Sequence, residues 1–600
     1  MSTATRARTL FRLLAGASLA VLLAPGQADA RTGKDPVDAR SLLGSYLAGR
    51  IARGQHDTPA ASQFYGRALQ RDPSNEALIE QALIMEASEG RFDDAFRLAR
   101  QLHALQPNHR MAQLMLGLSE AKAGRHAAAD EHFKASGTGL IGELTSALSR
   151  AWGLTAQGDS KAAIDLLDGV KQAEWTQHFL RYHKALILDV SGRRAEARAA
   201  YERIFRTDPK TMRTTLAYAQ HASASGEQKL ARSILEEHAK KIGGTPHPMA
   251  KAVQDQLKGN ERTGLLVTAP AEGLAEAFYG LGELLSGDGG LHVAAIYLQM
   301  ALHLQPGQPL ALAALANIYE TTKRYDAAIA SYEQIPRNTP LQAAVDIRKA
   351  LNLNQLERVD EAKALLEQLA DTDRTDVRAL DALGNIMRGR KRYQEAADYY
   401  TRAIAIIGPK PDRKHWTYFY ARGTCYERLK KWPQAEADLL KAMQLSPDQP
   451  LVLNYLGYSW VDQNRNLKAG LQMIEKAVSL KPDDGYIVDS LGWAHYRLGN
   501  YKEAVKHLEK AVELKPEDPV LNDHLGDAFW RVGREIEARF QWEQALTLKP
   551  EEDDVEKIRA KIAKGLPAKP PARVVKKSKE PVKAEGPKRQ TKLGSQRPPE

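Results

Sequence analysis

A repeat of about 34 residues constrains this chain more than any other feature of its sequence. Residues 489–516, DSLGWAHYRLGNYKEAVKHLEKAVELKP, align with residues 523–550, DHLGDAFWRVGREIEARFQWEQALTLKP, so that Leu, Gly, Ala and Pro recur in step. Apolar residues fall at helical spacing on both sides of a Gly or polar break, which predicts two amphipathic helices in each unit. Pro516 and Pro550 lack a backbone donor, so we expect each to end its unit.

The same pattern extends upstream through most of the chain. Clear copies begin at Asn454, Ala382, Ala314 and Gly280, and fainter copies begin at Ala185 and Ala48. We count about fourteen units between residues 41 and 550. A chain of 600 residues is longer than one compact core usually supports, and an array of stacked units accounts for that length.

The recurring residues resemble the motif of the tetratricopeptide repeat family. The motif positions in one unit are Leu491, Gly492, Ala504, Leu508, Ala511 and Pro516. His495 departs from the motif, because an aromatic residue is usual there, and the next unit keeps the aromatic as Phe529. The resemblance implies an all-α fold, an α-solenoid in which helix pairs stack into a right-handed superhelix.

The register of the repeats breaks once, at residues 243–276. This segment contains GLLVTAP, a short stretch with extended-chain character between Gly264 and Pro270. It is either a joint between two blocks of repeats or a surface insertion in one continuous superhelix. The expected division is therefore a signal peptide (1–30), an N-terminal block (31–242), the joint or insertion (243–276), a C-terminal block (277–550), a capping helix (551–564) and a disordered tail (565–600).

The first 30 residues have the three regions of a secretory signal peptide. Arg6, Arg8 and Arg12 precede an apolar run at residues 13–24, and Ala-Asp-Ala at residues 28–30 predicts cleavage after the last of these. Twelve apolar residues are few for a membrane span, so we expect export to the periplasm. The chain has one cysteine and cannot form an internal disulfide, so its stability must come from packing.

The net charge of +11 is unevenly distributed. Residues 565–600 hold ten Lys or Arg against three Glu, and residues 1–30 hold three Arg against one Asp, which leaves +2 for the body. A nearly neutral body does not fit a nucleic-acid binder, whose cations gather on a folded face. The basic tail either binds an anionic envelope polymer or lipid through charge, or is a solvated tether without a target.

The positions that vary between units are candidates for partner binding. Asp489, Trp493, Tyr496 and Arg497 lie within an arc of about 100° on the first helix of their unit, opposite Leu491. The family resemblance implies that this side of each first helix lines a groove that receives peptides or partner helices. The predicted groove residues are Asn454, Tyr458, Asp462, Asp489, Trp493, Tyr496, Arg497, Asp523, Asp527, Trp530 and Arg531.

Two interpretations of these groove residues stay open. Aromatic rings beside Arg are typical of side chains that carry binding energy once a partner buries them. The alternative is that the Trp residues only pack against neighbouring helices while the charges are solvated. Some members of the family hold a terminal carboxylate between cations, but this chain has Asp489 and Asp523 at the matching positions. A basic or mixed-charge ligand therefore fits better.

No motif in the sequence indicates catalysis, a cofactor or a metal site. The His residues are scattered, His495 and His524 fall at core-facing or flanking positions, and Cys425 has no partner base nearby in the sequence. The order of the last three units resembles long exported tetratricopeptide repeat proteins of alphaproteobacteria, which implies a role in the cell envelope. We therefore expect a non-catalytic periplasmic scaffold for envelope proteins. The alternative is a regulatory or adaptor subunit of a polysaccharide-synthesis or secretion complex.

Overall fold

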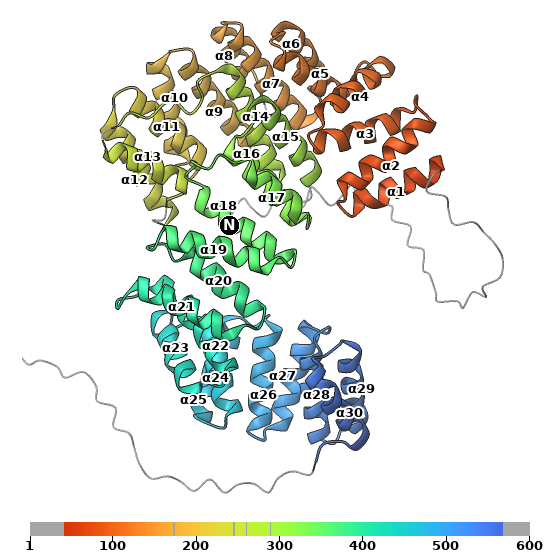
Figure 1. The fold of residues 1–600 in the computed structure, drawn as a ribbon, viewed down its shortest axis with the longest axis vertical. Helices are drawn as coiled ribbons and strands as arrows, with labels where there is room; N and C mark the ends of the chain where they lie inside the picture. Colours follow the sequence, from red (N-terminus) through yellow and green to blue (C-terminus); the bar gives the residue numbers. More distant parts are fainter. Residues whose placement is uncertain (1–40, 172–173, 244–245, 260, 288–289, 568–600) are drawn as a thin grey trace, which may run out of the picture. The chain divides into compact units, whose positions relative to one another are not determined.

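The computed structural model describes residues 41–171, 174–243, 246–259, 261–287 and 290–567. The predicted signal peptide and residues 568–600 of the predicted tail lie outside the described residues. Within those ranges the chain forms thirty α-helices and no β-strand, so the predicted all-α solenoid is confirmed (Figure 1). Twenty-eight helices follow one another as fourteen pairs, while α13 and α30 stand outside the pairing.

The chain divides into two compact units, unit 1 at Met1–Leu365 and unit 2 at Leu366–Glu600. The helices of unit 1 are α1 (Leu42–Gly54), α2 (Thr58–Arg71), α3 (Glu76–Ser88), α4 (Phe92–Leu105), α5 (Arg110–Lys122), α6 (His126–Ala135), α7 (Gly139–Ala156), α8 (Ser160–Asp168), α9 (Glu174–Val190), α10 (Arg194–Thr207), α11 (Met212–Ala224), α12 (Gln228–Ile242), α13 (Pro248–Lys258), α14 (Pro270–Leu285), α15 (Leu291–Leu304), α16 (Pro309–Thr321), α17 (Tyr325–Glu333) and α18 (Gln342–Gln355).

Helix α19 (Val359–Thr372) crosses the division between the units. The other helices of unit 2 are α20 (Arg378–Gly389), α21 (Tyr393–Ile407), α22 (Trp416–Arg428), α23 (Trp432–Leu445), α24 (Pro450–Asp462), α25 (Leu467–Leu480), α26 (Gly485–Arg497), α27 (Tyr501–Leu514), α28 (Pro519–Arg531), α29 (Glu535–Thr547) and α30 (Glu552–Lys564).

The repeated small residues lie where the two helices of a pair meet. A Cβ on Gly492 would lie 2.6 Å from Leu508 Cγ, and one on Gly526 would lie 2.5 Å from Trp542 Cδ1. Such distances leave no room for a side chain, so both positions require glycine. Ala504 and Leu508 are fully buried between α26 and α27. Ala511 packs with Leu521 of the following pair, which links one repeat to the next.

The break in the repeat register lies inside unit 1, whereas the two compact units divide at residues 365 and 366. Residues 243–276 contain α13, which packs on α11 and α12, and the first turns of α14. Val267 is buried, and the Thr263 N–H donates to Ser223 Oγ at 2.9 Å. The stretch with extended character is therefore packed against α11 without pairing into a sheet.

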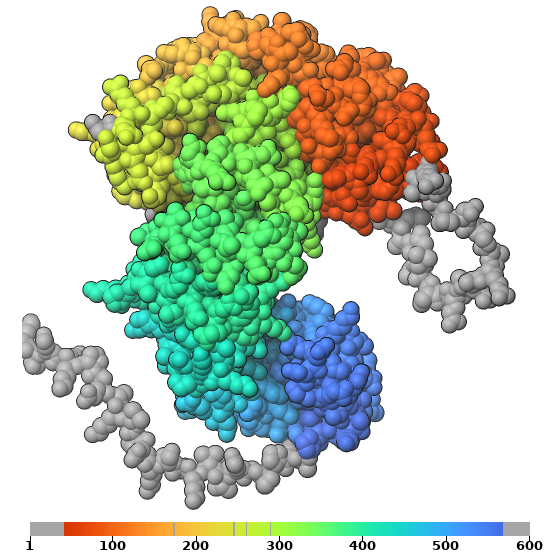
Figure 2. Space-filling view, in the orientation of Figure 1, coloured from red at the N-terminus to blue at the C-terminus, as the bar shows by residue number. Residues whose placement is uncertain are grey.

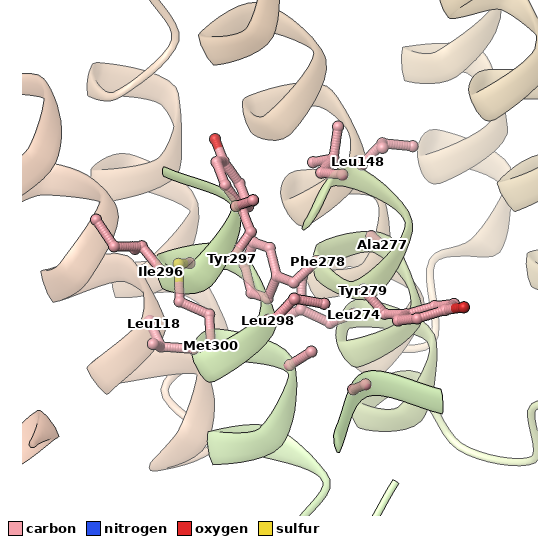
Figure 3. Packing of buried hydrophobic residues seen from close by; sticks show 14 of the residues in the cluster. Leu118, Leu148, Leu274, Ala277, Phe278, Tyr279, Ile296, Tyr297, Leu298 and Met300 are labelled. Carbon is pink, nitrogen blue, oxygen red and sulfur yellow. The ribbon is translucent and has the colours of Figure 1, made fainter. Parts of the chain in front are cut away.

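Helices α14 and α15 pack against first helices of the N-terminal pairs. Helix α14 contacts α7 and α9, and α15 contacts α3. In the space-filling view this green segment lies directly against the orange and red helices of the first pairs (Figure 2). Figure 3 shows Phe278, Tyr297 and Leu298 from α14 and α15 gathered beside Leu118 and Leu148 of the N-terminal pairs. One continuous hydrophobic cluster therefore joins residues on both sides of the register break.

Candidate partner-binding surface

We call the eleven predicted groove residues, all in unit 2, the stripe; nine of them are at least partly exposed, whereas Asp489 and Asp527 are buried. All eleven lie on α24, α26 and α28, the first helices of three successive pairs. Helix α26 contacts both α24 and α28, so the three helices lie side by side. Side chains four residues apart share a helix face, which aligns Asn454, Tyr458 and Asp462 on α24 with their counterparts on the next two helices.

Three stacked rings occupy the middle of the stripe. Trp493 lies parallel to Tyr496, with ring centroids 4.7 Å apart, and parallel to His524 on the other side at 4.0 Å. Trp493 and Tyr496 are half-buried. Among the described residues, the Trp493 Nε1 group has no hydrogen-bond partner, and neither does Asn454 Oδ1. Two polar atoms of the stripe are thus left unsatisfied by the chain itself.

His524 is largely buried beside the stripe, at the core-facing or flanking position that the sequence suggested. Its Nδ1 lies 3.0 Å from Asp489 Oδ1, and Asp489 is 5% exposed. Burial favours the neutral imidazole, but the Asp489 carboxylate outweighs it and raises the pKa of His524 above its ordinary value. The stack on Trp493 therefore carries an imidazole whose positive charge is stabilised near neutral pH.

The charged residues of the stripe are paired along the array. Arg497 donates from Nη1 to Asp462 Oδ1 at 2.6 Å and from Nη2 to the Asp462 carbonyl at 2.7 Å. Arg531 Nε donates to the Tyr496 hydroxyl at 3.3 Å. Each bond joins a residue to one about 35 positions earlier, so these contacts tie neighbouring first helices together. The charges are therefore less available to a ligand than the sequence alone suggests.

The last position of the stripe is covered by the chain's own C-terminal segment. Lys561 of α30 contacts both carboxylate oxygens of Asp523, at 2.9 and 2.8 Å, and Asp527 Oδ1 at 2.7 Å. Trp530, predicted as part of the groove floor, instead packs near Trp542 and under Gly565. Sequence reasoning missed Lys561, although its distance of 34 residues from Asp527 repeats the period of the array.

Unit 1 has a second surface that is also formed by the first helices of successive pairs. There α14 packs on α9 and contacts α11. A pocket of about 310 Å³ opens there beside Phe179, Tyr182, Arg213 and Glu276. Arg213 donates to Glu276 through Nε at 2.8 Å and through Nη2, and the Tyr182 hydroxyl donates to Glu276 Oε1 at 2.9 Å. The charges under this pocket are therefore mutually satisfied.

Burial governs the ionisation of groups around this pocket. Burial opposes the positive charge of Arg213, but the Glu276 carboxylate outweighs it and raises the pKa of the guanidinium. Burial also lowers the pKa of His183 to about 3, so this imidazole is neutral at ordinary pH. Trp152 Nε1 donates to its Nδ1 at 3.1 Å, which fixes the tautomer with the proton on Nε2.

The described residues also bear on metal binding, cysteine reactivity and membrane spanning. They contain no cluster of three or more His, Cys, Asp or Glu side chains able to hold a metal ion. Cys425 is buried, and burial raises the pKa of its thiol to about 11, so it stays protonated and unreactive at neutral pH. Over the same part of the chain, no helix is long and apolar enough to cross a membrane.

Comparison with known proteins relates these helix pairs to one family. Models of the tetratricopeptide repeat match residues 86–136, 311–344, 347–413 and 488–518. A TPR repeat-containing protein of Pseudomonas aeruginosa is 29% identical over 197 residues, which cover 32% of this chain and 31% of that protein. The E3 ubiquitin-protein ligase CHIP of Arabidopsis thaliana is 28% identical over 123 residues, covering 20% of this chain and 42% of the ligase. The matches thus span less than half of either relative.

Solved structures of repeat proteins are also similar. A tetratricopeptide repeat protein from Parabacteroides merdae aligns with 41% of this chain and 95% of its own, at 14% identity and a TM-score of 0.35. Yeast Tom70 aligns with 87% of this chain and 95% of its own, at 14% identity and a TM-score of 0.30. The four matched segments and the succession of helix pairs show that the chain contains tetratricopeptide repeats.

Proposed function

We propose that this protein is a non-catalytic scaffold that binds a segment of a partner protein on the stripe of unit 2. The observation that carries the proposal is the stack of Trp493 between Tyr496 and His524, with the Trp493 Nε1 group unpaired within the described residues. Aromatic side chains on a repeat surface supply large contact area at low entropic cost. The Nε1 atom itself is buried, so a partner contacts the exposed part of the Trp493 ring and not its N–H group.

The dimensions of the stripe favour a peptide segment over a small molecule. Packed helices lie about 8–10 Å apart, so three first helices present a surface about 20 Å across. An extended chain rises about 3.3 Å per residue, so about six residues cross it. Asp462 is exposed at one edge while Arg497 is partly engaged with it. A segment with basic or mixed charge therefore suits this edge better than an acidic one.

The site of action that we propose is the periplasm, where the scaffold supports cell-envelope integrity or assembly. The charged, apolar and Ala-Asp-Ala regions of residues 1–30 support export. The alternative is a regulatory or adaptor subunit of a polysaccharide-synthesis or secretion complex. Mass spectrometry of the protein purified from the envelope fraction should find a mature chain that begins at Arg31. A chain that retains residues 1–30 in the cytoplasm would refute the proposed location.

The basic tail supplies a second contact in this proposal, to an anionic envelope polymer or lipid. Ten Lys or Arg among residues 565–600 support it. Sedimentation with anionic vesicles should decrease when residues 568–600 are deleted and when the salt concentration is raised. Unchanged sedimentation after the deletion would show that the tail is only a solvated tether.

Site-specific photocrosslinking in cells tests the binding surface. A photoreactive residue replacing Tyr458, on the stripe, should capture a discrete partner that mass spectrometry identifies, and the additional change Trp493→Ala should abolish the capture. The matched control replaces Lys506, an exposed residue of the second helix α27 with a side chain 73% exposed. Equal capture from both positions would contradict binding on the stripe.

A further inference from the structure

Helix α30 continues the geometry of the stripe beyond the last complete repeat. It begins 33 residues after α28, and Lys561 follows Asp527 by one period of the array. Gly565 follows Arg531 by the same distance. In this register α30 is the first helix of a further unit whose second helix is absent from the described residues. Its side chains therefore occupy the next position along the same surface.

Lys561 is held on the stripe by carboxylates alone. Its side chain is 18% exposed and contacts three oxygens of Asp523 and Asp527, whose side chains are 20% and 8% exposed. Removing an ammonium group from water is costly unless anions compensate it, and two carboxylates do so here. Trp542 Nε1 also donates to Asp527 at 3.0 Å, which orients that carboxylate toward the lysine.

Beyond α30 the chain turns back onto the stripe. Gly565 adopts a positive φ of 70°, and a Cβ at this position would lie 1.9 Å from Trp530 Cζ2. Arg531 Nη1 donates to the Pro567 carbonyl at 2.8 Å. The segment is therefore held by a hydrogen bond to its backbone and by a close approach of Gly565 to the Trp530 ring, and both contacts are of kinds that a peptide segment can make.

We propose that Asp523, Asp527, Trp530 and Arg531 form a lysine-peptide subsite, which the chain's own residues 561–567 occupy in cis. A partner segment that presents a lysine, then a glycine four residues later and a backbone carbonyl beyond it, binds the subsite by displacing them. This inference rests on the proposed function, because it extends the partner's path along the stripe. It also names the partner's chemistry, a basic segment with a small residue.

Because residues 561–567 belong to the same chain as the subsite, they compete strongly with a free peptide for it. A segment joined directly to its site experiences an effective concentration in the millimolar range, so a free peptide of equal intrinsic affinity competes poorly. A partner that also contacts Trp493 and Tyr496 adds binding energy that the cis segment lacks. Full engagement of the stripe is therefore coupled to release of α30.

The test uses the full chain and a fluorescein-labelled peptide of residues 552–567 as the probe. The release variant Ile558→Glu/Lys561→Ala/Gly565→Val removes the buried contact of α30, the lysine and the glycine that fits on Trp530. We expect it to bind the probe at least tenfold more tightly than the unmodified chain in fluorescence anisotropy. The matched control Lys557→Ala changes an exposed lysine of the same helix that forms an ion pair with Asp554, and it should bind like the unmodified chain.

Two further binding measurements test the contact between Lys561 of the probe and Asp523 of the chain. A probe carrying Lys561→Ala should bind the release variant at least tenfold more weakly, and so should the release variant that also carries Asp523→Asn. Equal binding of the probe by the release variant and the unmodified chain would overturn the inference. Because the probe is the chain's own segment, this result is independent of whether the photocrosslinks on Tyr458 succeed.

The release variant could fail simply because it unfolds, so hydrogen exchange of the unmodified chain provides a test that needs no substitution. If the segment is displaceable, amides of 552–567 exchange through local opening, at least tenfold faster than those of α28 and α29. Exchange of all three helices at one common rate would show that α30 is a permanent cap and would overturn the inference.

Discussion

The first helices of unit 1 and those of unit 2 belong to the same repeat, but they differ in how far the rest of the chain covers them. In unit 1, α14 and α15 of the same chain pack on several of them and bury their faces (Figure 3). In unit 2, the rings of Trp493 and Tyr496 remain partly exposed, and only the last position is covered by α30. A repeat creates a surface, and what the rest of the chain places on that surface decides whether a partner can use it.

The side chains of the two surfaces reflect this difference. On α7 the covered face includes small polar residues, and Thr145 and Ser149 are each 1% exposed. The Thr145 hydroxyl lies 2.8 Å from the Tyr297 hydroxyl of α15, so its polarity is satisfied across the contact. On α26 the equivalent face carries large aromatic rings that contact one another. Both surfaces carry aromatic rings, but in unit 1 a small residue, Gly273 of α14, lets the covering helix approach the Trp152 ring closely.

Breaking the buried ion pair should produce the largest effect on the covered surface. Glu276→Ala leaves Arg213 without a compensating charge in a buried site, which typically costs about 3–5 kcal/mol. Urea denaturation of the full chain should show this loss in the transition of unit 1 while that of unit 2 is unchanged. Glu236→Ala, at an exposed position on α12 of the same unit, is the control. A loss below about 1 kcal/mol would mean that water replaces the glutamate at no great cost.

Crowding the contact between α14 and α7 should produce the next largest effect. A Cβ on Gly273 would lie 2.3 Å from the Trp152 ring, so Gly273→Leu should destabilise unit 1 by about 3 kcal/mol through overpacking. Gly264→Ala serves as the control, because no heavy atom lies within 4 Å of a Cβ there. If Gly273→Leu is tolerated like the control, α14 is not fixed on the N-terminal pairs.

Removing the exposed ring of unit 2 should affect binding more than folding. Trp493→Ala should weaken partner binding by about 2 kcal/mol, roughly thirtyfold, as for a central aromatic contact of an interface. The partner captured at Tyr458 supplies the titrant, and isothermal calorimetry measures the change. Thermal unfolding of the same variant separates the two interpretations: a large fall in the melting temperature with unchanged affinity would assign Trp493 to packing alone.

The smallest predicted effect is a pH dependence confined to unit 2. His524 has a raised folded pKa, so its contribution to stability is complete below the unfolded value of about 6.5 and is lost as pH rises through the folded pKa. Asp489, Asp523, Asp527 and Lys561 are the charged groups around it. Unfolding free energy should thus fall by about 1 kcal/mol between pH 6 and pH 9.

The comparison of the unmodified chain with Asp489→Asn isolates this contribution of His524. His183 in unit 1 has a lowered pKa, so its contribution has the opposite sign and stability rises as pH increases through the unfolded value. That opposing contribution cancels in the difference between the two proteins. An identical pH profile for both would show that the carboxylate does not hold the imidazole charged.

The sequence was a good guide to the repeat and a partial guide to the stripe. Leu508 and Gly492 lie where their spacing predicts, because helix pairs meet at short and regular sequence distances. The stripe residues lie on neighbouring first helices for the same reason. His524 is largely buried, as a core-facing or flanking position implies, but its contact with Asp489 on another helix is not represented by a single helical wheel.

The chain's own sequence determined the all-α fold, the positions where paired helices touch and the rows of side chains on each first helix. These depend on contacts within about one period of 34 residues, so a local pattern specifies them. Only the tertiary structure decided that α14 covers α7 and α9, that Arg213 meets Glu276 across 63 residues, and that Lys561 closes the stripe. Such contacts depend on the total rotation that builds up over many successive helix pairs. The residue pattern within one repeat does not determine that total rotation.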